Sequence, residues 1–170
     1  MKLTRPIIKE LSLEAYNDTS ILNSVAANLD NMDFKKVKTK YAKGGWDALS
    51  LHGYGNHPLD ILKPGVLKSS VNIDTKLQWT TLSVITTMKP ILGMLKKLPC
   101  EFERVRFMRL EAGKVIGKHT DKIDKDIGFD DGDIIRIHMP IRTNDNVVFT
   151  LYESTKDKDG TEYNLKTGHY

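Results

Sequence analysis

The spacing of apolar residues in the first hundred positions predicts two short helices and one strand. From Ser20 to Leu29 it predicts a modest core helix, whose buried face consists of Ile21, Leu22, Val25 and Leu29. A second helix is predicted between Pro90 and Pro99, because a proline can open a helix but also stops one. Its apolar residues are Ile91, Leu92, Met94, Leu95 and Leu98. Between the two helices, residues 46–52 alternate as a strand does and run into a glycine-punctuated turn.

From Val105 onward the pattern changes to short strands with Gly, Asn and Asp at the joints. The predicted strands are residues 105–110, 115–119, 134–141, 147–152 and 162–165. Their spacing of about ten residues is typical of β-sandwiches and barrels. We therefore predict a mainly β protein with flanking helices, forming a single domain over residues 1–170. In it, residues 1–100 form a helical and irregular part with one strand near 46–52, and residues 101–170 form the β core.

Composition narrows the class of protein. The 170 residues are 39% hydrophobic and 28% charged, as in an ordinary soluble globular protein, which excludes disordered and collagen-like chains. No apolar run approaches the roughly 20 residues that span a bilayer, and the N-terminus has no apolar signal-peptide region. We therefore expect a cytoplasmic protein without a membrane segment. The single cysteine, Cys100, excludes an internal disulfide and is expected to be a small buried side chain.

Charge gives little indication of a partner. The net charge is +4, and the lysines have no interleaved aromatic residues on which bases could stack. We therefore expect no nucleic-acid partner, and we interpret the lysine run between residues 35 and 43 as a solvated face. The sequence assigns no oligomeric state.

His119 and Asp121 are the candidate metal ligands. On a strand, residues i and i+2 point to the same face, so an imidazole nitrogen and a carboxylate oxygen would meet one ion. Two histidines and one carboxylate on one face leave positions open for a cosubstrate and O₂, as in non-haem Fe(II) oxygenases. His119 and Asp121 supply two of these three ligands.

Arg136 and His138 form a second polar pair on the predicted strand 134–141. The alternation places both on one face and the apolar residues on the other. If that face is the interior of a barrel, the two cations are costly unless they bind an anion such as the carboxylates of a keto acid. Two alternatives stay open, namely an exposed sheet face that carries two basic residues, and a metal site that His138 completes.

Three further segments are weaker candidates. Residues 155–160 have the rhythm of an EF-hand loop but lack its ligands at the first and last positions, and we interpret them as a hairpin turn. The acidic segment 121–133 is interpreted as a hydrated loop, with a cation site as the alternative. His52 and His57 lie in or beside a glycine-rich turn, where we expect exposed side chains that are not ligands.

Three motifs in order resemble the aspartyl/asparaginyl β-hydroxylase family, which includes relatives that hydroxylate free proline. They are R-L-x-x-G at residues 109–113, H-x-D at 119–121 and R-x-H-x-P-I-x-T-N at 136–144. Residues 46–55 and 98–101 also resemble the upstream region of smaller members. The resemblance covers roughly residues 40 to 170, and residues 1–39 show none.

The resemblance implies a double-stranded β-helix, that is a jelly roll of the cupin type. It also implies an enzyme that uses Fe(II), 2-oxoglutarate and O₂ to hydroxylate an Asp, Asn or Pro-type amino acid, free or in a peptide. His119 and Asp121 match the metal ligands, and Arg136 and His138 match positions on the 2-oxoglutarate side. No catalytic residue beyond the metal site is implied.

The C-terminal part of the family pattern is not found in this chain. In the family, the strand that residues 162–170 resemble is followed by further strands with a distal metal His and an Arg for 2-oxoglutarate. His169 comes too early to match that ligand. We therefore expect a truncated dioxygenase whose activity is open, and a non-catalytic remnant or binding module on the same β-scaffold is the alternative. A cupin-like metalloprotein completed by His138 is the third hypothesis.

Overall fold

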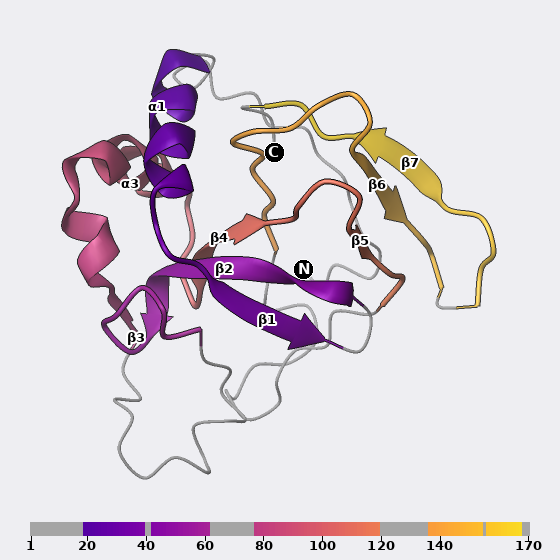
Figure 1. Ribbon diagram of the computed structural model, residues 1–170, viewed down its shortest axis with the longest axis horizontal. Coiled ribbons are helices and arrows are strands. Elements are labelled where there is room, and N and C mark those ends of the chain that lie inside the picture. The colour runs from indigo at the N-terminus through magenta and orange to yellow at the C-terminus, as the bar shows by residue number, and fades with distance from the viewer. Residues whose placement is uncertain (1–18, 40–41, 62–76, 120–135, 155, 168–170) are drawn as a thin grey trace, which may run out of the picture. The chain divides into compact units, whose positions relative to one another are not determined.

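The computed structural model describes residues 19–39, 42–61, 77–119, 136–154 and 156–167 (Figure 1). These residues form two compact units, each described by itself below. The sheet unit comprises Met32–His119, and the hairpin unit comprises Met1–Asn31 with Thr120–Tyr170. The described part of the chain is mainly β with antiparallel sheets, as the sequence predicts. The prediction of a single domain over residues 1–170 stays a prediction.

A five-stranded antiparallel sheet forms the sheet unit, with β2 (Ala42–Tyr54) as its central strand. The strand predicted at residues 46–52 is confirmed and is longer than its alternating core. It pairs with four others: β1 (Lys35–Thr39), β3 (Leu77–Trp79), β4 (Val105–Arg109) and β5 (Val115–Ile116). β4 and β5 run one after the other along β2, and the turn between them contains Gly113 at a φ of 74°.

The residues of β2 are buried on both faces of the sheet. On one face Trp46 and Ala48 pack with Ala42, and Val37, Ile61 and Ile116 cover this cluster. On the other face Leu49 and Leu51 are 2% and 0% exposed. Both faces of the sheet are therefore covered at the centre of β2, whereas an alternating pattern is typical of a strand with one face in solvent.

Two 3₁₀ helices and an α-helix follow β3. They are η2 (Thr81–Val84), η3 (Thr86–Met88) and α3 (Lys89–Leu95). Thr80 joins η2 to β2, since its hydroxyl donates to the Ser50 carbonyl at 2.7 Å and its N–H donates to the Leu51 carbonyl at 3.0 Å. The helix predicted after Pro90 is confirmed as α3, with proline in its first turn, but it ends at Leu95, before Leu98 and Pro99.

The hairpin unit contains α1 (Thr19–Asp30) and a two-stranded antiparallel sheet of β6 (Val148–Leu151) and β7 (Thr161–Asn164). The predicted helical face is confirmed, with Leu22, Val25 and Leu29 buried together with Ala26. The prediction that residues 155–160 belong to a hairpin turn is also confirmed for the described residues 156–160, which lie in the connection from β6 to β7. Asp157 closes this turn, and its carboxylate accepts from the Ser154 N–H at 2.7 Å.

Three expectations about local structure are wrong. Residues 136–141 of the predicted strand 134–141 form no strand, and Pro140 supplies a reason because it has no N–H for a ladder. The strand predicted at 115–119 ends at Ile116. Cys100, expected to be buried, is exposed just after α3. The lysines of β1 are exposed as predicted, at residues 35, 36 and 38.

No described helix combines the length and the apolar composition that a bilayer crossing requires.

Candidate active site

The predicted site residues fall in different parts of the structure. His119 is the last residue of the sheet unit and is exposed. Arg136 and His138 are exposed residues of the hairpin unit. Asp121 lies outside the described residues, as does the whole acidic segment 121–133. The structure therefore describes three of the four residues, with His119 in the sheet unit and Arg136 and His138 in the hairpin unit.

The local structure around His119 sets the proton on its ring. After β5, the chain leaves the sheet at Gly117, and the His119 Nδ1 lies 2.8 Å from the Gly117 carbonyl oxygen. A carbonyl oxygen can only accept, so Nδ1 must be the protonated nitrogen in this contact. In the neutral ring, the other nitrogen, Nε2, then carries the lone pair. A backbone carbonyl that accepts from Nδ1–H is a common orienting partner of metal-binding histidines.

His57 has the opposite arrangement. Its Nδ1 accepts a hydrogen bond from the Leu59 N–H at 3.1 Å, so the neutral ring carries its proton on Nε2. Its main-chain N–H donates to the Asp60 carboxylate at 3.0 Å, within the same tight turn. His57 is exposed, as expected, and in this tautomer it offers no exposed lone pair to a metal. The two exposed histidines of the sheet unit, His57 and His119, therefore differ in the role of Nδ1, which accepts a hydrogen bond in His57 and donates one in His119.

His52 is buried, and the expectation that it is exposed is wrong. It belongs to β2, is 9% exposed, and its ring centroid lies 4.7 Å from that of Trp79 on the paired strand β3. Its Nδ1 donates to the Glu103 carbonyl at 3.1 Å. Burial lowers the pKa of His52 below its ordinary value, and the hydrogen bond to Glu103 opposes that shift. The glycine-rich turn nearby suggested exposure, but the strand continues through His52 to Tyr54.

Arg136 and His138 lie on a segment without helix or strand. The argument that a strand turns both side chains to one face therefore does not hold for the described residues 136–141. The His138 ring contacts Phe149 of β6, with 5.6 Å between the ring centroids. This contact joins the segment to the hairpin sheet and gives His138 a fixed neighbour.

The R-L-x-x-G motif has a structural role in the sheet unit. Arg109, at the end of β4, donates to the buried Asp47 of β2 at 3.2 Å and lies over the Phe34 ring at 4.2 Å. Gly113 allows the positive φ of the turn that follows. The motif therefore directs the chain from β4 to β5 and onward to His119.

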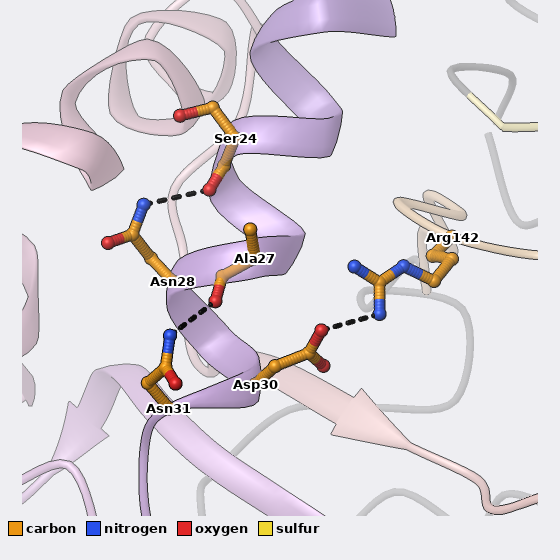
Figure 2. Close-up of polar contacts among 6 residues, drawn as sticks. All are labelled: Ser24, Ala27, Asn28, Asp30, Asn31 and Arg142. Carbon is orange, nitrogen blue, oxygen red and sulfur yellow. Dashed lines mark hydrogen bonds and ion pairs between the residues drawn. The ribbon is translucent and has the colours of Figure 1, made fainter.

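Sequence reasoning missed one contact in the hairpin unit, the ion pair between Asp30 and Arg142. The Arg142 Nη1 donates to the Asp30 carboxylate at 2.7 Å, across 112 positions of sequence (Figure 2). Arg142 occupies a variable position of the third motif, and no local pattern links it to the end of α1. Its place inside that motif is the signal that could have drawn attention to it.

One open pocket of about 300 Å³ is present in the sheet unit. Its lining is mostly apolar and includes Leu49, Leu82 and Ile85, with Asp33 and His57 among the polar residues. None of His119, Arg136 and His138 lines it. This pocket therefore gives no support to the predicted site.

The fit of a metal rests on the donor that the structure describes. Among the described ranges, no three His, Cys, Asp or Glu side chains gather as a possible metal site. Asp121 lies outside those ranges, so the pair predicted from the sequence is described at His119 alone. His119 fits the role because Nδ1 hydrogen-bonds to the Gly117 carbonyl, so that Nε2, the nitrogen farther from the backbone, is the one that carries the lone pair of the neutral ring.

Comparison with known proteins identifies one family. The model of the aspartyl/asparaginyl β-hydroxylase family matches residues 16–162, most of the chain. The match begins well before residue 40, so the expectation that residues 1–39 show no resemblance is wrong for α1 and β1. No curated protein matched the chain, and no solved structure did.

Proposed function

The chain belongs to the aspartyl/asparaginyl β-hydroxylase family, and from this premise we propose that it is an Fe(II)- and 2-oxoglutarate-dependent dioxygenase. Its substrate is an Asp, Asn or Pro-type amino acid, free or in a peptide. Its fold is the double-stranded β-helix of the cupin type. The mainly antiparallel architecture and the family match support the proposal.

The observation that carries the proposal is the hydrogen bond from His119 Nδ1 to the Gly117 carbonyl. It holds the ring in the tautomer whose Nε2 can bind a metal, at the residue that the H-x-D motif assigns to that role. His119 and Asp121 would hold Fe(II). When bound, Fe(II) and 2-oxoglutarate supply an oxidative decarboxylation that is coupled to hydroxylation of the substrate.

The overall reaction balances without a further reductant. One oxygen atom of O₂ enters succinate as 2-oxoglutarate loses CO₂, and the other becomes the hydroxyl group on the substrate carbon. The protein would therefore also bind a dianionic keto acid. Arg136 and His138 supply cationic or hydrogen-bonding groups for its carboxylates, since charge-assisted hydrogen bonds to carboxylates are the strong ones.

Succinate formation tests the proposal. The chain is incubated with Fe(II), ascorbate, 2-oxoglutarate and O₂, with free Asp, Asn, Pro or short peptides that contain them, and succinate is measured by NMR. We expect succinate from the wild type, and loss of it in His119→Ala and in Asp121→Ala.

His57→Ala is the matched control, because it removes an exposed histidine of the same unit whose tautomer does not suit a metal. We expect its succinate formation to equal that of the wild type. Absence of succinate from the folded wild type with every substrate would overturn the enzyme proposal in favour of the binding module. Full activity in His119→Ala would overturn the assignment of the metal ligand.

A further inference from the structure

The C-terminal end of α1 carries an unusual charge. Asp30 is the last residue of the helix, and the last turn contains no basic residue. The negative end of a helix dipole disfavours a carboxylate and favours a cation. The side chains of Asn28 and Asn31 donate to the Ser24 and Ala27 carbonyls at 2.8 and 2.9 Å, which satisfies backbone acceptors but brings no positive charge (Figure 2).

Arg142 supplies the missing cation from a distant part of the hairpin unit. Its guanidinium lies against the Asp30 carboxylate in Figure 2, with Nη1 2.7 Å from Oδ2. It therefore compensates both the carboxylate and the negative end of the helix. The side chains of Arg142 and Asp30 are 57% and 51% exposed. An ion pair this exposed changes an equilibrium constant by at most about fivefold, so it contributes little to the stability of the whole fold.

The segment that Arg142 anchors is the one that carries Arg136 and His138. Residues 136–143 have no helix or strand hydrogen bonds to fix them. Their described contacts with the rest of the hairpin unit include the Asp30 ion pair and the ring contact of His138 with Phe149. After Arg142 the chain turns, and the Val147 N–H donates to the Asn144 carbonyl at 3.0 Å. Where a segment lacks the ladder hydrogen bonds of regular structure, a side-chain ion pair contributes to setting its position.

We propose that Asp30 is a positioning residue, which acts through Arg142 to hold the Arg136–His138 segment in the arrangement that binds 2-oxoglutarate. The inference rests on the proposed function, and it gives helix α1 a part in cosubstrate binding. Asp30 itself touches neither cosubstrate nor metal in this proposal.

The first readout is hydrogen exchange of residues 136–147 in the metal-free chain without cosubstrate. We expect exchange about two- to fivefold faster in Asp30→Asn and in Arg142→Gln than in the wild type. Asp30→Glu and the exchanged pair Asp30→Arg with Arg142→Asp should recover most of the protection, because each keeps opposite charges at the two positions. The difference between wild type and Asp30→Asn should shrink from low salt to about 1 M salt, since salt screens an exposed ion pair.

The second readout is the dissociation constant for 2-oxoglutarate, measured by calorimetry with Mn(II) in place of Fe(II). Asp30→Asn should raise it about two- to fivefold while the melting temperature changes little. Asp33→Asn is the matched control, because Asp33 is also an exposed carboxylate but makes no ion pair with a described residue. It should leave both readouts at the wild-type value.

The outcomes separate this inference from the function on which it rests. Unchanged exchange of residues 136–147 in both Asp30→Asn and Arg142→Gln overturns the positioning role. Faster exchange without recovery in the exchanged pair also overturns it, because the effect would then not come from charge pairing. Faster exchange with recovery, in a wild type that binds no 2-oxoglutarate, supports the anchoring of the segment and overturns the proposed function.

Discussion

The sheet of the sheet unit and residues 136–147 of the hairpin unit are held in different ways. β2 has ladder hydrogen bonds to four strands, and its central residues Ala48 and Leu51 are fully buried. Residues 136–147 contain no helix or strand, and their contacts include an exposed ion pair, a ring contact and a turn, while Ile137 is 45% exposed. We therefore expect removal of a single surface charge to loosen residues 136–147, whereas the sheet should lose stability only when its packing is disrupted.

Leu51→Ala should produce the largest loss of stability. Leu51 is 0% exposed at the centre of β2, and removing a fully buried leucine side chain costs about 2–5 kcal/mol through lost burial and the cavity left behind. Urea unfolding measures the loss. Val84→Ala is the control, since Val84 is 75% exposed and its truncation should change the free energy of unfolding by less than about 0.5 kcal/mol. Equal losses in the two variants would contradict the burial difference.

Gly45→Ala should destabilise the sheet by about 1–3 kcal/mol. Gly45 has a φ of +73°, and an added Cβ would lie 2.6 Å from the Val37 carbonyl oxygen of β1. Gly93→Ala is the matched substitution in α3, where nothing lies within 4 Å of the added Cβ. It should stabilise the protein by about 0.5–1 kcal/mol because alanine favours a helix. The two changes should therefore shift the urea midpoint in opposite directions.

His52 should make stability depend on pH. Its pKa is lowered in the folded state, so the unfolded chain binds more protons at this site. The stabilising contribution is therefore present above the unfolded pKa of about 6.5 and is lost as the pH falls below it. Unfolding measured between pH 7.5 and 5 should show this loss in the wild type, and His52→Gln should show less of it. An identical pH dependence in both proteins would contradict the burial of a neutral His52.

Asp30→Asn should lower stability by less than about 1 kcal/mol, well below the loss in Leu51→Ala, because both partners of its ion pair are more than half exposed. Urea unfolding of this variant beside Leu51→Ala tests the contrast between the two regions directly. A loss as large as that of Leu51→Ala would show that the ion pair belongs to the core of the fold.

The sequence predicts the regular, buried elements well. The apolar faces of α1 and α3 and the alternation in β2 are local patterns that burial produces, and all three are confirmed. The hairpin turn predicted from the Asp-x-Asp-Gly pattern of residues 155–160 is also found, at the described residues 156–160. The sequence does not predict β1, because its exposed lysines suggest a solvated face. Among the described strands β1 pairs only with β2, so it lies at an edge of the sheet, where lysine side chains protect against pairing with another strand.

The site could be predicted only in part. The motifs select His119 and assign the family, but the tautomer depends on the position of the Gly117 carbonyl, which no residue pattern specifies. The alternation at residues 134–141 predicts a strand, but Pro140 has no N–H for a strand ladder, and the described residues 136–141 form none. The pairing of Asp30 with Arg142 depends on tertiary structure, since local periodicity carries no information across 112 positions.

Anaerobic titration with Fe(II) tests the central claim most directly, namely that His119 is a metal ligand. Binding is measured by calorimetry for the wild type, His119→Ala and His57→Ala, with circular dichroism to show that each variant is folded. We predict that His119→Ala weakens binding by more than about tenfold and that His57→Ala binds as the wild type does. A wild type that binds no Fe(II), or a His119→Ala variant that binds it equally well, would contradict the account.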